Sequence, residues 1–454
     1  MKTLYAICLS AGLALQPLFA SGSTAPKNDK QDMVSFFTQK LKGGQLSNAP
    51  SKSLKAKDIK LWQSQVWKAW KEAQAGFDEE RLSPIDTLGS KAAFKWNMPA
   101  GSEPNTVMPY YWGFKGDVKP VNGYPLFVYL HGSGPKAQEW STGLKLAFYF
   151  DDDPSAYFIP QIPNEGEYYR WWQKGKQYIW EKVFRQTMAS GDIDPNKIYC
   201  FGISEGGYGS QRLASYYADY LAAAGPMAGG EPLKNAPAEN CANIGFSFLT
   251  GAEDYGFYRN ILTTYTKEAF DSLQAAHPGY YDHRIRLIPE KGHGIDYRPT
   301  TPWLKQHVRN PYPKYVYWED FPMDGRYRSG FYNLAVTERP DRQNPEGRTR
   351  YEMSISGNTV TLNIDKVTYQ TIQKDPRFGI EMKFRKTYTP ATGGKLLVYL
   401  CSELVDLNKK VTVIVNGKQV FCGKPKANVK HMMNSCATYF DPCRIYPAAV
   451  EVSF

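Results

Sequence analysis

The stretch Ile198–Ser210, IYCFGISEGGYGS, decides the fold of this chain. Its first part is apolar and is typical of a buried strand, and the part from Gly206 onward is typical of a helix. Between them stands GISEG, with Ser204 at its centre. This G-x-S-x-G spacing places a serine on a sharp strand-to-helix turn, but alone it is a weak signal. The interpretation therefore depends on whether the rest of the chain supplies the partners that such a serine needs.

The surrounding sequence places this stretch in an α/β domain. From about Val107 to Val308, short apolar segments alternate with segments of helical periodicity. Strands that are apolar along their whole length predict a mostly parallel sheet with helices on both faces. The proline-containing stretch NPYP at residues 310–313 ends the helical pattern. Beyond it the sequence changes to short alternating segments, with Asn416-Gly417 as a tight hairpin turn. This change predicts a β-rich, sandwich-like C-terminal domain.

These patterns divide the 454 residues into four parts. Residues 1–20 carry a positive charge, a short apolar run and a small-residue cleavage point, which predict a signal peptide. Residues 21–105 form an N-terminal arm, whose amphipathic helix is expected to dock its aromatic face onto the main domain or, alternatively, to bind sugar with it. The α/β domain is expected at 106–310 and the β-rich domain at 311–454. We therefore expect an exported protein, periplasmic or extracellular.

Composition narrows the class of partner. Lys and Arg number 55 against 44 Asp and Glu, a net charge of +11 that is spread over both halves and not gathered into a nucleic-acid-binding run. An exported basic protein suits an anionic polymer such as an acidic polysaccharide, although a generally basic surface explains the charge equally well. No segment after the signal is long and apolar enough to span a membrane.

Export also makes disulfides possible. Cys200 lies in a predicted buried strand and is expected to be a free thiol of the core. Four further cysteines crowd the C-terminal end and allow three pairings, among which the sequence does not choose: Cys401, Cys422, Cys436 and Cys443.

A nucleophilic serine needs a base and an acid. His293 lies in EKGHG, in the loop after the last predicted strand of the α/β domain, with a glycine on each side. Asp254 and Glu253 lie in LTGAED, at the end of the strand before it. The chain order serine, acid, histidine is the one that a serine-histidine-acid triad of this fold requires. Position favours Asp254, and Glu253 remains the alternative because only side-chain direction separates the two.

The negative charge that develops on a reacting carbonyl needs hydrogen-bond donors. YLHGSGP follows an early strand, so backbone N–H groups near Gly132 and Ser133 are candidates, together with the N–H of Glu205. His131, in the same loop, is expected to shape it and not to act as the base.

The stretch EYYRWWQKGK is the candidate substrate-binding segment. It follows a strand end, so Trp171 and Trp172 would offer a platform for sugar and Arg170 a contact for an anionic group. Packing of these aromatic residues in the core is the equally weighted alternative.

The motifs LFVYLHGSG, GISEGG, LTGAED and EKGHG together resemble the α/β-hydrolase superfamily, in its secreted esterase branch. The resemblance covers about residues 107–308. It implies Ser204 as nucleophile, Asp254 as acid and His293 as base, without metal or cofactor. HGSG departs from the HGGG loop of many lipases, which leaves the oxyanion donors open.

The predicted signal peptide, arm and β-rich tail are also similar to bacterial carbohydrate esterases, including pectin methylesterases of this fold. The implied function is hydrolysis of ester groups on a plant-type polysaccharide, with methyl esters of an acidic, pectic glycan preferred. Acetyl or feruloyl esterase activity is the first alternative. A serine peptidase of the same fold and a catalytically inactive sugar-binding protein follow. The expected partner is a polysaccharide or oligosaccharide, without nucleic acid.

Overall fold

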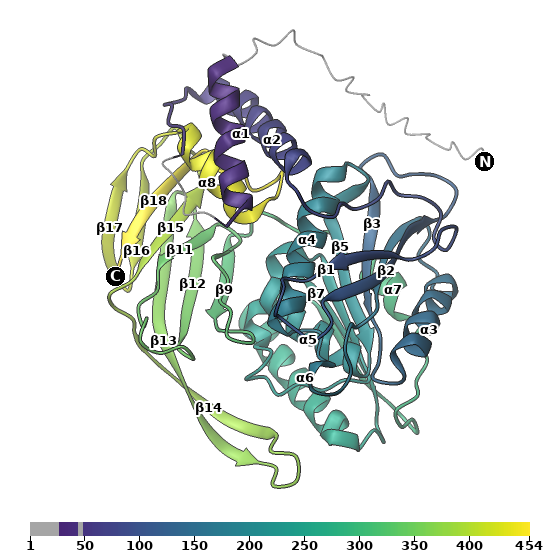
Figure 1. The fold of residues 1–454 in the computed structure, drawn as a ribbon. Helices are drawn as coiled ribbons and strands as arrows, with labels where there is room; N and C mark the ends of the chain where they lie inside the picture. Colours follow the sequence, from purple (N-terminus) through teal and green to yellow (C-terminus); the bar gives the residue numbers. More distant parts are fainter. Residues whose placement is uncertain (1–26, 44–48) are drawn as a thin grey trace, which may run out of the picture.

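The computed structural model describes residues 27–43 and 49–454 (Figure 1). The predicted signal peptide, residues 1–20, lies outside the described residues. A helix-covered sheet forms one side of the molecule, the β-rich C-terminal part forms the other, and two N-terminal helices lie against the C-terminal part (Figure 1).

The helix-covered sheet has eight strands in the order β1-β2-β4-β3-β5-β6-β7-β8. The pairs of β2 with β1 and with β4 are antiparallel, and every other pair is parallel. Strand β5, which contains the first half of the stretch Ile198–Ser210, lies in the middle of the sheet. The strands are β1 Phe94–Asn97, β2 Val107–Lys115, β3 Tyr124–Leu130, β4 Ser155–Pro160, β5 Ile193–Ile203, β6 Ala223–Met227, β7 Gly245–Gly251 and β8 His283–Ile288.

Both faces of this sheet are buried, which explains the continuous apolar strands. On β3, Leu126 and Val128 face a core shared with α4, α5 and α6, whereas Phe127 and Tyr129 face a second core shared with α3 and α7. The helices are α3 Lys136–Tyr149, α4 Lys174–Ser190, α5 Glu205–Tyr217, α6 Arg259–Ala276 and α7 Thr300–Leu304. This strand order with helices on both faces is the arrangement of an α/β-hydrolase, as the sequence predicted.

The sheet begins earlier than the predicted boundary at residue 106. Strand β1, which falls within the predicted arm, pairs with β2 from Phe94 opposite Tyr110 to Asn97 opposite Val107. Trp96 is fully buried against Tyr110 and Phe158, so burial of aromatic surface holds this segment on the sheet.

The C-terminal part contains two further sheets. One has the order β10-β11-β15-β18, and the other has β17-β16-β13-β12-β9 with β14 paired to β13. Trp318 of β9 stacks on Phe331 of β10 with centroids 5.6 Å apart, so the two sheets share one core. The elements are β9 Tyr315–Asp320, β10 Gly330–Phe331, β11 Leu334–Glu338, β12 Arg348–Ser356, β13 Thr359–Lys374, β14 Glu381–Pro390, β15 Lys395–Leu400, β16 Val411–Val415, β17 Lys418–Gly423, α8 Val429–Tyr439 and β18 Ala448–Ser453.

The predicted hairpin turn at Asn416-Gly417 is confirmed. It joins the antiparallel strands β16 and β17, and both turn residues have positive φ, 46° and 79°. Asparagine and glycine tolerate this left-handed backbone better than other residues, which is why this pair predicts the turn.

The amphipathic helix of the arm docks elsewhere than expected. Helix α2, Ile59–Gly76, packs its buried residues Trp62, Val66 and Trp70 against α1, Lys27–Leu41, and against α8 of the C-terminal part. The aromatic face is therefore core, not a sugar-binding surface, and it lies mainly against the C-terminal part instead of the α/β sheet. The helical period was readable from the sequence, whereas the docking partner was not.

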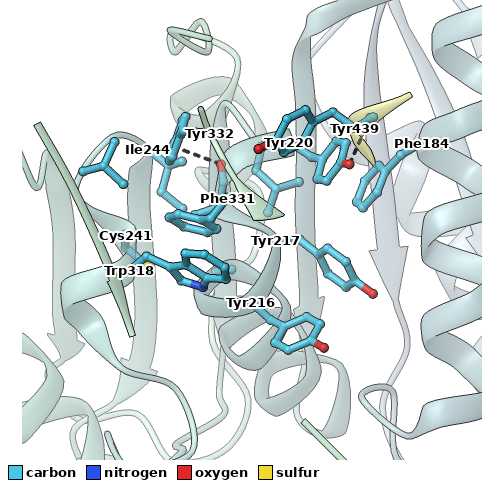
Figure 2. Packing of buried hydrophobic residues seen from close by; sticks show 14 of the residues in the cluster. Phe184, Tyr216, Tyr217, Tyr220, Cys241, Ile244, Trp318, Phe331, Tyr332 and Tyr439 are labelled. Atoms are coloured by element: carbon cyan, nitrogen blue, oxygen red, sulfur yellow. Dashed lines mark hydrogen bonds between the residues drawn. The ribbon is translucent and has the colours of Figure 1, made fainter. Parts of the chain in front are cut away.

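The α/β and β-rich parts meet through aromatic side chains at the C-terminal end of α5 (Figure 2). Tyr220 stacks on Phe440 with centroids 5.4 Å apart, and its hydroxyl donates to the carbonyl of Tyr439 at 3.0 Å. Tyr216 and Tyr217, one turn earlier, are buried in the same cluster (Figure 2). This continuous core holds the two parts in one arrangement.

The six cysteines of the described residues, including the four near the C-terminus, are all free, and Cys200 is buried as expected. In residues 27–43 and 49–454, no helix combines the length and the apolar character that crossing a membrane requires.

Candidate active site

Ser204 stands between the end of β5 and the start of α5, with φ 55° and ψ −114°. A positive φ is strained for a residue with a side chain and persists only where the surroundings impose it. The turn lies at the carboxyl edge of the parallel strands, where side chains from several loops meet. The stretch Ile198–Ser210 therefore forms the strand-turn-helix geometry that the G-x-S-x-G spacing predicts.

Two glycines make this turn possible. A Cβ at Gly206 would lie 1.9 Å from the carbonyl oxygen of Leu130, and one at Gly202 would lie 2.5 Å from the carbonyl oxygen of Gly206. Neither approach is sterically allowed, so both positions require glycine in this fold.

His293 lies beside the serine, in the loop after β8. Its Nε2 is 3.0 Å from Ser204 Oγ and its Nδ1 is 2.7 Å from Asp254 Oδ2. The histidine side chain is 47% exposed, whereas Asp254 is buried. The three predicted residues thus form one hydrogen-bonded chain with the spacing that proton transfer requires.

The structure also separates the two candidate acids. Asp254 contacts His293 and accepts a second bond on Oδ1 from Arg259 Nη1 at 3.0 Å. Glu253 is exposed, and its backbone N–H donates to the carbonyl of Lys291 at 2.8 Å. The side chain that faces the histidine is therefore that of Asp254.

The HGSG loop is held by buried hydrogen bonds. His131 Nε2 accepts from the N–H of Ile162 at 3.1 Å, which leaves Nδ1 to donate to the carbonyl of Gly132 at 2.8 Å. Burial lowers the pKa of His131 to about 4, so the ring is neutral near pH 7. The Tyr169 hydroxyl donates to the Gly132 carbonyl at 2.6 Å. His131 shapes the loop, and it makes no contact with Ser204.

A cavity of about 520 Å³ opens beside Ser204, within the size range of ligand sites. Ser133 and Glu205, the predicted oxyanion residues, both line it. Of the predicted substrate-binding residues, Arg170 and Trp172 line it and Trp171 does not. The remaining lining residues are Tyr208, Arg212, Gly230, Glu231, Pro232, Asn235, Phe257, Arg259, Phe378, Gly379, Ile380 and Glu381.

The prediction for Trp171 is wrong. This side chain is fully buried, donates from Nε1 to the carbonyl of His131 at 3.0 Å, and meets the His131 ring edge-on at 4.9 Å. Its neighbour Trp172 points into the cavity instead, with the Arg212 guanidinium 3.9 Å from the ring centroid. Adjacent residues here face opposite ways, one supporting the HGSG loop and the other the cavity.

Glu205, the residue after Ser204, also contributes its side chain to the cavity wall. Its carboxyl group is buried, with Oε2 3.2 Å from Arg170 Nη1, while Oε1 has no hydrogen-bond partner in the described residues. Burial raises the pKa of Glu205 to about 8, because loss of solvation outweighs the attraction of Arg170. At neutral pH the wall next to Ser204 therefore carries a neutral carboxyl group.

Three cavity residues that the sequence analysis missed surround this group. Arg212 is 2.8 Å from Glu231 Oε1, and Arg259 lies with its guanidinium 5.7 Å from the Tyr208 ring. Tyr208 and Arg212 follow Ser204 at steps of four along the sequence, so helical spacing places them on the side of α5 that carries Ser204. That spacing was a usable signal, whereas Arg259 is recognisable only from its contact with Asp254.

Comparison with known proteins adds a distant relative. No family model matches the chain. One curated protein, feruloyl esterase B of Thermothelomyces thermophilus, is 26% identical over 185 residues, which are 37% of this chain and 61% of that protein. The chain thus spans about three fifths of that relative.

The chain also has distant likenesses among solved structures. A thermostable esterase is 22% identical, with a TM-score of 0.36, covering 50% of this chain and 64% of that one. An S-formylglutathione hydrolase of Staphylococcus aureus is 14% identical, with a TM-score of 0.35, covering 50% of this chain and 97% of that one. At such TM-scores the fold rests on the sheet topology described above, and not on these likenesses.

Proposed function

We propose that the protein is a serine carboxylic ester hydrolase. The observation that carries this proposal is the hydrogen-bonded chain from Ser204 Oγ through His293 to Asp254, with the serine on a strained turn at the mouth of a cavity. The sequence motifs around these three residues predict a nucleophile, a base and an acid, and the contacts of the three side chains suit those roles.

The reaction follows from this geometry. His293 Nε2 takes the Ser204 proton as Oγ attacks the ester carbonyl, and Asp254 holds the ring and stabilises the imidazolium. The tetrahedral intermediate collapses as His293 returns the proton to the leaving alcohol. Water, deprotonated by His293, then attacks the acyl-serine, and release of the acid regenerates the Ser204 hydroxyl.

The carbonyl oxygen becomes negatively charged during both attacks. We assign its stabilisation to the backbone N–H groups of Ser133 and Glu205, which flank Ser204 in the cavity. The N-terminus of α5 starts at Glu205 and adds the positive end of its helix dipole.

The proposed substrate is an ester of an acidic, plant-type polysaccharide, with methyl-esterified uronate as the preferred form. Arg170, Arg212 and Arg259 all line the cavity, and guanidinium groups suit the carboxylates of unesterified neighbouring sugars. The neutral state of Glu205 at pH 7 removes one negative charge that would oppose such a substrate. Action on this polymer implies an exported protein, as the sequence of residues 1–20 predicts.

Feruloyl ester hydrolysis is the second candidate. It is favoured by the relative that is named a feruloyl esterase, and by the ring of Trp172 in the cavity lining. In this case the aromatic acid would be the acyl group and the polysaccharide hydroxyl the leaving group.

The test compares Ser204→Ala with Ser141→Ala, which removes a serine hydroxyl from α3, outside the cavity lining. We expect the wild type and Ser141→Ala to hydrolyse p-nitrophenyl acetate, and Ser204→Ala to lose at least about 10⁴-fold in kcat. Methanol release from methyl-esterified pectin, measured beside ferulate and acetate release from substituted xylan, identifies the acyl group. Absence of ester hydrolysis by the wild type would overturn the proposal and leave a sugar-binding protein or a peptidase.

A further inference from the structure

One wall of the cavity comes from the C-terminal part of the chain. Strands β13 and β14 form a long hairpin that extends beyond the β-rich part and runs toward α6 (Figure 1). Phe378, Gly379 and Ile380 of its connecting turn, with Glu381 at the start of β14, line the cavity that holds Ser204. The site is therefore shared between two parts of the chain.

Specific contacts hold the tip of the hairpin in this position. The Tyr258 hydroxyl donates to Asp375 Oδ1 at 2.7 Å, and Lys234 pairs with Glu381 Oε2 at 2.8 Å. Asp375 also accepts the backbone N–H of Phe378 on Oδ2 at 2.5 Å, which orders the turn itself. These bonds hold the turn, and with it the Phe378 ring, at the cavity.

Phe378 meets a second phenylalanine there. The Phe257 and Phe378 rings have centroids 4.7 Å apart at an angle of 49°, and these residues remain 47% and 42% exposed. Phe257 and Tyr258 both have positive φ, 52° and 59°, so strained backbone presents the Phe257 ring. Leaving two aromatic rings open at a cavity forgoes burial energy, which is typical of a binding surface.

An arginine guanidinium lies over each ring of this pair. The Arg259 guanidinium lies 5.3 Å from the Phe257 ring centroid, and that of Arg377 lies 4.8 Å from the Phe378 ring centroid. A hydroxylated ring that lies on the phenylalanines would place its carbon face on apolar surface and its polar edge beside guanidinium donors.

We propose that Phe257 and Phe378, with Arg259 and Arg377, form a subsite for a sugar ring of an acidic glycan, next to the sugar whose ester lies at Ser204. This subsite rests on the proposed esterase function and adds to it that the substrate is a chain, bound across the α/β sheet and the hairpin. The half-open rings suit a sugar that stays in contact with water, and an enclosed slot would suit an aromatic acyl group better.

The experiment uses Phe378→Ala, with Ile372→Ala as the matched control. Ile372 is an exposed apolar residue of the same hairpin, outside the cavity lining. We expect Phe378→Ala to raise KM for methyl-esterified polygalacturonan about tenfold, and this loss should be at least about fivefold larger than any loss in kcat/KM for p-nitrophenyl acetate. Ile372→Ala should leave both substrates unchanged, and Phe378→Trp should retain the low KM because it keeps an aromatic face.

Two results would overturn the subsite. One is an unchanged KM of Phe378→Ala for the polymer, and the other is an equal loss on the small ester, which would assign the hairpin to support of the Asp254 loop. Binding distinguishes this inference from the function: Ser204→Ala and Ser204→Ala/Phe378→Ala are compared on polygalacturonan by affinity electrophoresis. Weaker binding by the double variant supports the subsite even if no ester is hydrolysed, and equal binding contradicts it.

Discussion

At the scale of single residues, Glu205, which follows the proposed nucleophile Ser204, combines a backbone and a side-chain contribution to the site. The backbone of Glu205 begins α5 beside the proposed oxyanion, while its carboxyl group is buried against Arg170. A carboxylate there would oppose the negative charge of the tetrahedral intermediate, so the proposed reaction is favoured by the protonated form. Burial, which raises the pKa to about 8, supplies that form at neutral pH.

This predicts a pH dependence that Glu205→Gln removes. In the wild type, Glu205 keeps its proton below about pH 8 and ionises above it, so kcat/KM should fall by about tenfold as pH rises through that value. Glutamine is neutral at every pH and leaves the backbone N–H in place, so the variant should hold its activity to higher pH. Initial rates on p-nitrophenyl acetate from pH 6 to 10 check this, and identical profiles for the two proteins would contradict it.

Stability gives a second readout of the same group. The unfolded carboxyl loses its proton near its ordinary pKa of 4.5, whereas the folded one keeps it to about pH 8. The unfolding free energy of the wild type therefore falls with rising pH across this interval. The Tm of Glu205→Gln relative to the wild type should accordingly increase from pH 5 to pH 8.

At the scale of elements, the unit that defines the site is the junction of β5 and α5. It brings Ser204 to the edge of the sheet because α5 packs closely against β3 and β6, with no room for a side chain at Gly206. The hairpin of β13 and β14 is the second such unit, since its turn completes the cavity wall. Helix α2 shows the opposite case, an aromatic element that serves only packing.

The junction predicts a large effect of Gly206→Ala. The added methyl group would meet the Leu130 carbonyl oxygen at 1.9 Å, so the turn must shift and Ser204 must leave its position beside His293. We expect the unfolding free energy, measured by urea denaturation, to fall by about 1–3 kcal/mol, and most of the esterase activity to be lost.

Gly294→Ala is the matched control, because it adds the same methyl group next to His293, where no atom lies within 4 Å. It should change stability by less than about 0.5 kcal/mol and keep activity. A Gly206→Ala protein that is as stable and active as this control would contradict the claim that the turn at Ser204 has no room for a side chain at position 206.

At the scale of the whole molecule, a buried network of charges joins the α/β and β-rich parts. Asp219 Oδ1 pairs with Arg328 Nη1 at 2.9 Å and its Oδ2 with Arg444 Nη1 at 2.5 Å. Asp441 pairs with Arg309 Nη1 at 2.6 Å and with Arg444 Nε at 2.7 Å. Buried charges need oppositely charged partners, so the network favours one relative placement of the two parts and with it the position of the hairpin.

Asp219→Ala is therefore predicted to be strongly destabilising. It leaves Arg328 and Arg444 buried without this carboxylate, at a cost of about 3–5 kcal/mol. Asp296→Ala, which removes the carboxylate of an exposed pair with Arg298, should cost less than about 1 kcal/mol. Calorimetric unfolding of both variants checks this, and similar Tm values would show that the network does not join the parts.

The same network sets a limit at low pH. Burial opposes the charged form of Asp441, but Arg309 and Arg444 overcome it and lower its pKa to about 2. This depressed pKa contributes stability that is complete above the ordinary value of 3.8 and is lost as pH falls through about 2. The contribution of Asp441 to stability should hence be lost only in strong acid.

Local sequence by itself determined the order of strands and helices, the serine on its turn, and the loops that carry His293 and the acid. These follow from hydrophobic period and from glycine spacing, which act over a few neighbouring residues. The parallel sheet then brings the three loops to one edge, because the carboxyl ends of parallel strands lie together.

Only the tertiary structure decided which of two adjacent candidates is used. In the structure the side chain of Asp254, and not that of Glu253, contacts His293, and Trp172 but not Trp171 lines the cavity. Phe378, which lies more than 170 residues after Ser204 in the sequence, lines the same cavity. One residue along a loop reverses the direction of a side chain, and contact between distant segments depends on how whole elements pack. Local spacing determines neither of these, so the sequence was enough to predict the proposed nucleophile but not the residues that surround it in the cavity.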